Sequence, residues 1–141
     1  MRSKSKGIRD DGGKSQAVAW HREIVGMVAD LRRAFDANDE NAEERARERI
    51  QESALSVEVR SGWYSPGCPD DDSRKPEEGC ILLCTGGPAV RLLCNLSEHG
   101  EPTDVVIEYQ DWGTPWTEYH PGGVAGDDTL ERFAGCFYFG G

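Results

Sequence analysis

Carboxylates and aromatic side chains that could form a binding or catalytic site gather in one segment, residues 108–119, which reads EYQDWGTPWTEY. Tryptophan and tyrosine are enriched at protein interfaces because each buries a large area and keeps a polar tip. The acidic neighbours would direct these anchors towards a basic groove. The sequence therefore predicts a partner-binding surface made of Glu108, Asp111, Trp112, Trp116, Glu118 and Tyr119. The alternative is that Trp112 and Trp116 only cover an edge or end of a sheet.

The same segment also permits catalytic interpretations. Its carboxylates could act as an acid/base pair beside the tryptophans, as in carbohydrate enzymes. Outside this segment, Cys68 could be a nucleophile with His99 or His120 as its base. The sequence contains no glycine-rich nucleotide cradle, no zinc spacing among its cysteines and histidines, and no calcium loop. We therefore expect no catalytic residues, no cofactor and no metal. A small enzyme or ligand-binding protein with a Trp112/Trp116 pocket is the alternative.

The distribution of charge indicates the kind of partner. The chain has a net charge of −10, from 26 acidic and 16 basic residues. Residues 1–60 are balanced, with 12 of each, whereas residues 61–141 hold 14 acidic and 4 basic side chains. A field of one sign repels nucleic-acid phosphates and attracts basic surfaces. We expect a basic protein partner and no direct binding to nucleic acid, although an acidic surface can also serve solubility alone.

Length and composition indicate one cytosolic domain. A chain of 141 residues is the size of a single domain. Residues 1–14 have the composition of a flexible basic tail, which leaves residues 15–141 as one α+β domain. We find no apolar run long enough for a membrane span and no secretory signal. The odd number of cysteines, five, favours a reducing cytoplasm.

The period of the apolar residues predicts the elements that must position the segment 108–119. Apolar residues three and four apart between positions 17 and 35 predict a helix, and a second helix should follow from Asn41, which would cap it. From residue 53 the period becomes two, which predicts a strand with Leu55, Val57, Val59, Ser61 and Trp63 on its half-buried side.

Further strands are expected at residues 80–85, 89–96, 103–110 and 136–139, with a surface loop at 65–79. Asp127 or Asp128 can cap a short helix that runs through Phe133. Short turns favour antiparallel pairing. The predicted fold is α+β, with an N-terminal helical hairpin packed on an antiparallel sheet of four or five strands.

Three segments resemble a group of small accessory proteins of bacterial plasmids, integrative elements and phages: residues 55–64 (LSVEVRSGWY), 80–91 (CILLCTGGPAVR) and 108–119. The resemblance implies a bacterial cytoplasm and a link to mobile DNA. Small acidic proteins of such elements often counter host defence, and anti-CRISPR proteins are an example. The resemblance thus implies a non-enzymatic inhibitor that binds a basic, nucleic-acid-handling surface of a host nucleoprotein or CRISPR complex, away from any membrane. A plasmid-maintenance accessory protein is a further alternative.

Overall fold

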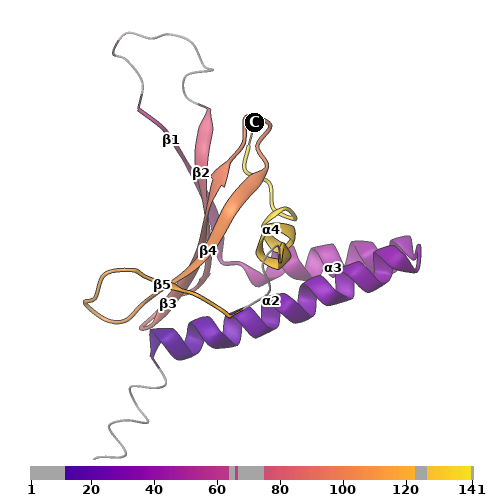
Figure 1. The fold of residues 1–141 in the computed structure, drawn as a ribbon, viewed down its shortest axis with the longest axis horizontal. Helices are drawn as coiled ribbons and strands as arrows, with labels where there is room; N and C mark the ends of the chain where they lie inside the picture. Colours follow the sequence, from indigo (N-terminus) through magenta and orange to yellow (C-terminus); the bar gives the residue numbers. More distant parts are fainter. Residues whose placement is uncertain (1–11, 64–65, 67–74, 123–126, 141) are drawn as a thin grey trace, which may run out of the picture.

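The computed structural model describes residues 12–63, 66, 75–122 and 127–140. Two helices, α2 (Gly13–Asp36) and α3 (Glu40–Ser53), come first, and a short helix, α4 (Thr129–Ala134), follows the strands. Figure 1 shows these three helices on the same side of the sheet. The arrangement confirms the predicted α+β fold, a helical hairpin packed on an antiparallel sheet.

The sheet is an antiparallel meander in which neighbours in sequence are neighbours in space. Glycines with positive φ permit its tight turns, for example Gly86 at +98° and Gly100 at +80°. The five strands, in chain order and in sheet order, are β1 (Ser56–Ser61), β2 (Pro76–Cys84), β3 (Ala89–Leu96), β4 (Pro102–Gln110) and β5 (Thr117–Tyr119).

The core lies between α2 and one face of the sheet. Ile81, Leu92 and Ile107 are paired side by side on three adjacent strands and are at most 1% exposed. Helix α2 contributes the predicted apolar stripe, which includes Ile24 and Val28, and contacts β3, β4 and β5. Among the described residues, no helix combines the length and apolarity needed to cross a bilayer.

Both long helices begin earlier than the sequence predicts. Helix α2 already includes Gly13 and Lys14, which we expected in the tail. Residues 1–11 of that tail lie outside the described residues. Helix α3 is capped by Asp39, whose side chain accepts a hydrogen bond from the Ala42 amide at 3.1 Å, and not by Asn41. An aspartate fits this position because its oxygen satisfies an amide that the helix leaves free.

The prediction of a terminal strand at residues 136–139 is wrong, and the fifth strand is β5. After α4 the chain stays irregular, and Phe139 is 4% exposed. Its ring lies against Gly79 of β2, where a β-carbon would come within 2.7 Å of it. Residues 76–79 were expected in the surface loop, but they belong to β2. Most of the rest of that loop, with Cys68, lies outside the described residues.

Gly79 tests this packing. Gly79→Ala should lower the free energy of unfolding by about 1–3 kcal/mol, because the added methyl group overlaps the Phe139 ring. Gly26→Ala is the matched control, because a β-carbon at Gly26 would have no neighbouring atom within 4 Å. Removing a helical glycine there should stabilise the protein by up to about 1 kcal/mol. Urea denaturation measures both effects, and equal unfolding midpoints for Gly79→Ala and wild type would contradict this packing.

Candidate functional site

The face of the sheet turned away from the helices carries the side chains that alternate with the core. One row across the strands is Glu58, Cys80, Leu93 and Val106, and the next is Ser56, Leu82, Arg91, Glu108 and Glu118. A third row consists of Arg60, Glu78 and Asn95, with Asp104 bonded to Asn95. We call the surface made by these three rows the open face.

Arg91 is the centre of a partly buried cluster on the open face. Its Nε and Nη2 atoms lie 2.8 and 2.7 Å from Oε1 of Glu108. The Trp116 ring covers the guanidinium, with its centroid 4.0 Å from Cζ, a cation–π contact. The side chains of Arg91 and Glu108 are only 25% and 18% exposed. The structure therefore brings together two predicted site residues, Glu108 and Trp116, through an arginine that no sequence motif singles out.

Glu118 lies next to this cluster on β5. It is paired across the strands with Glu108, so two carboxylates are direct neighbours. Arg91 neutralises Glu108, and the Glu118 side chain, 42% exposed, lies 3.3 Å from Nδ1 of His120. Glu118 therefore adds a partly exposed carboxylate at the end of the row.

Two other predicted site residues lie away from the open face. Oδ1 of Asp111 accepts a hydrogen bond of 2.6 Å from the Gly13 amide, at the first turn of α2. The N-cap residue of that helix is Gly12, which has no side chain to do this. Tyr119 is paired with Ile107 in the core row and meets the His21 ring edge-on, at 6.4 Å between centroids. Both residues hold the sheet to α2.

Trp112 occupies the turn between β4 and β5 and is 82% exposed. Its indole nitrogen lies 3.5 Å from where a β-carbon at Gly87 would be, so it adjoins the turn between β2 and β3. This indole contributes little to the free energy of folding, because most of its apolar surface stays in water. Trp112 is thus available to a partner at one end of the sheet.

Three of the described cysteines lie at different places in the fold, and burial raises the pKa of each. Burial raises the pKa of Cys80, which lies on the open face, although nearby Arg91 lowers it in part. Burial raises the pKa of Cys94 to about 11 and also raises that of Cys136. These thiols stay protonated at neutral pH, and a protonated thiol is a poor nucleophile. The described residues form no cluster of three or more His, Cys, Asp or Glu side chains that could hold a metal.

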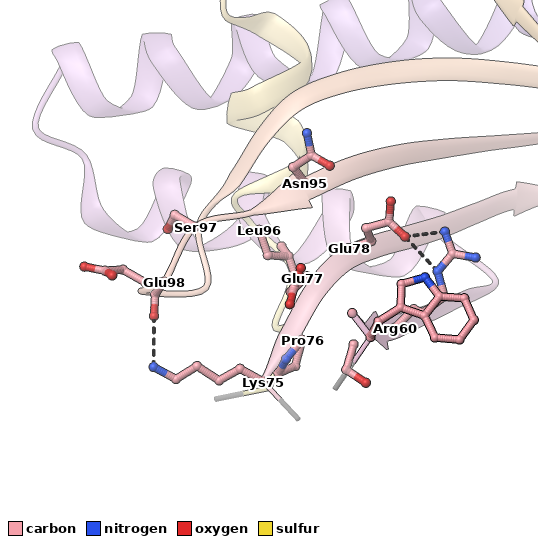
Figure 2. A pocket seen from close by; sticks show the side chains of 12 residues that line it. Arg60, Lys75, Pro76, Glu77, Glu78, Asn95, Leu96, Ser97 and Glu98 are labelled. Atoms are coloured by element: carbon pink, nitrogen blue, oxygen red, sulfur yellow. Dashed lines mark hydrogen bonds and ion pairs between the residues drawn. The ribbon is translucent and has the colours of Figure 1, made fainter. Parts of the chain in front are cut away.

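A cavity of about 1000 Å³ lies at the other end of the sheet, by the turn between β3 and β4. Figure 2 shows that its two basic side chains engage groups within the cavity wall: Arg60 is paired with Glu78, and Lys75 donates to the Glu98 carbonyl oxygen at 3.5 Å. Trp63, which also lines it, is fully exposed. The sequence does not predict this cavity, because its walls come from strand ends that share no motif.

Asp111 should matter for stability. Asp111→Ala removes the acceptor at the start of α2 and should lower the free energy of unfolding by about 1 kcal/mol. Asp36→Ala, at the exposed last residue of the same helix, removes an equal charge without a cap and serves as the control. Thermal and urea unfolding measure both variants. Equal stability of Asp111→Ala and wild type would show that the bond does not hold the helix.

A scan against protein-family models finds no match to this chain, and neither does a search of curated proteins or of solved structures. Function is therefore inferred from the geometry of the open face and of the turn that carries Trp112.

Proposed function

We propose that this chain is a non-enzymatic inhibitor of a bacterial defence complex, most specifically an anti-CRISPR protein. Its open face and Trp112 would dock on a basic, nucleic-acid-handling surface of that complex. The observation that carries the proposal is a sheet face that the described helices leave uncovered and that combines excess negative charge with half-buried apolar side chains. The setting in a bacterial cytoplasm comes from the resemblance to accessory proteins of mobile elements.

The charges of the open face favour a basic partner. The open face has two positive charges, the guanidinium groups of Arg60 and Arg91. Its five carboxylates are Glu58, Glu78, Asp104, Glu108 and Glu118. Each arginine is paired with one glutamate, which leaves three carboxylates in excess. Surplus charge on one face attracts a surface of opposite sign and raises the rate of encounter.

The centre of the open face supplies apolar area. Cys80, Leu82, Leu93 and Val106 are half-buried neighbours on β2, β3 and β4. A hollow of about 190 Å³ lies beside Leu93 and Val106. Interfaces of this kind have an apolar centre with a charged rim, and exposed tryptophans often contribute most of the affinity. Trp112, beside the turn that leads into β3, is placed to be such an anchor.

The same geometry disfavours an acid/base role for Glu108 and Asp111, two of the carboxylates proposed for catalysis. A general acid or base must be free to exchange a proton with a substrate. Glu108 is held by Arg91, and Asp111 accepts from the Gly13 amide. Trp116 stacks on Arg91, whereas Trp112 is mostly in solvent, so the two indoles have different surroundings. A binding role uses this arrangement without rearranging it.

Trp112→Ala tests the anchor. We expect affinity for the CRISPR effector complex that the protein inhibits to fall by about 2 kcal/mol, roughly 30-fold, without a change in thermal stability. Tyr138→Ala is the matched control, since Tyr138 is also 82% exposed but follows α4. Biolayer interferometry against a panel of purified, guide-loaded effector complexes measures the affinities. Equal affinities of Trp112→Ala and wild type would show that Trp112 does not contribute to the interface.

Removing charge tests the acidic docking face. The double variant Asp104→Asn, Glu118→Gln should slow association and flatten its salt dependence, because exposed charges are screened within about 8–10 Å at physiological salt. The control, Glu48→Gln with Glu52→Gln, removes two exposed charges from α3 on the other side of the sheet. Both variants have the same net charge, so only the location of the charge differs. Equal association rates for the two variants would contradict docking through the open face.

Infection tests the function itself. Expression of the chain in bacteria with an active CRISPR system should restore plaque formation by a targeted phage. Failure against every system of a broad panel, together with no binding to the purified effector complexes, would overturn the proposed function and favour the ligand-binding or plasmid-maintenance alternatives.

A further inference from the structure

The outer edge of β1 differs from the opposite edge of the sheet. Strand β1 is the first in sheet order, and no described strand pairs with its outer side. It has six residues and contains neither proline nor lysine. Strand β5, at the other edge, has three residues and is flanked by Pro115 and Pro121. Short strands and prolines are common protections of a sheet edge, because an open edge offers unpaired backbone groups to another strand.

The apolar side of β1 is also exposed. The alternation of the sequence predicts Leu55, Val59 and Trp63 on a half-buried side, but they are 60%, 46% and 104% exposed. Val57, between the first two, is half-buried and packs on the core. An exposed edge strand with apolar, β-branched side chains readily accepts a further strand.

We propose that a second copy of this chain pairs antiparallel with β1, centred on Val59, and joins the two sheets into one. A two-fold axis at Val59 places residue 58 of one copy opposite residue 60 of the other. Glu58 then faces Arg60 of the second copy, and Arg60 faces Glu58 of the second copy. The same register places Val59 opposite Val59 of the second copy, so this exposed apolar side chain gains an apolar neighbour.

The charge pattern of β1 favours pairing with a second copy of this chain over pairing with a strand of uniform charge. Glu58 and Arg60 lie on the same face, one residue either side of Val59, so the strand is self-complementary under a two-fold axis. A uniformly basic strand would bring like charge to Arg60, and an acidic one would bring it to Glu58. Arg60 already contacts Glu78 within its own chain, so pairing extends this contact into a row of Glu78, Arg60 and Glu58 of the second copy.

A charge-swap experiment on the full chain tests this pairing. Wild type should show a concentration-dependent dimer in sedimentation equilibrium. Glu58→Arg places arginine opposite arginine twice, and Arg60→Glu places glutamate opposite glutamate twice. Each variant alone should raise the dimer dissociation constant by at least about tenfold. An equimolar mixture should form a heterodimer with affinity near that of wild type, because both cross-strand pairs are then opposite in charge.

Two controls separate pairing from misfolding. Urea unfolding should show that both single variants are folded, and Val59→Lys, at the two-fold axis, should abolish the dimer. The inference is overturned if wild type stays monomeric up to about 100 µM. It is also overturned if the single variants dimerise as wild type does, or if their mixture does not associate. None of these outcomes depends on binding of a defence complex. Failure of this inference and failure of the proposed function are therefore distinguishable.

Discussion

All three described helices lie on one side of the sheet, where α2 and α4 pack on it directly, and this one-sided burial shapes the rest of the molecule. The apolar stripe of α2 covers the row of Ile81, Leu92 and Ile107. From β2 to β5 the strands are joined by four to six residues, too few for a helix that could cross to the other face. Because side chains alternate along each strand, burying one face turns the intervening side chains towards solvent. The open face is therefore a direct consequence of the topology.

The structure connects the core to the proposed binding turn. Asp111 begins the turn that carries Trp112 and Trp116, and it accepts a hydrogen bond from Gly13, which is 98 positions away in sequence. At the end of the turn, Trp116 is held by its stack on Arg91. Both ends of the turn are thus anchored before a partner arrives. Preorganisation of this kind favours affinity, because less conformational freedom is lost on binding. Pairing of β1 between two copies would add a second open face alongside the first.

Local pattern predicted much of the fold. The alternation at residues 89–96 predicted β3 with the bounds that the structure shows. The three-and-four spacing predicted the buried stripe of α2 from Ala17 to Leu31, but Phe35, the last residue of the predicted stripe, is exposed. The short strand β5 was missed because three residues between prolines carry almost no periodic signal. The aromatic run 136–139 resembles a strand, but Phe139 instead closes over Gly79, a contact that depends on a distant glycine.

The candidate site was less accessible to such reasoning. Residue type alone grouped Asp111 and Tyr119 with Glu108 and Trp116, and only the register of β4 and β5 separates the core row from the open face. The contact of Asp111 with Gly13 follows from tertiary packing and leaves no local signal. Trp63 fell on the apolar side of a strand pattern, yet nothing in that pattern revealed that this side lacks a cover.

Methyl cross-saturation by nuclear magnetic resonance tests the central claim, that a partner docks on the open face, most directly. The protein, with labelled leucine, isoleucine and valine methyl groups, is mixed with a CRISPR effector complex, the proposed partner, and the complex is irradiated. The account predicts signal loss at Leu82, Leu93 and Val106, while Ile24, Leu92 and Ile107 keep their intensity. Signal loss at exposed methyls on the helical side, with Leu82, Leu93 and Val106 unaffected, would contradict it.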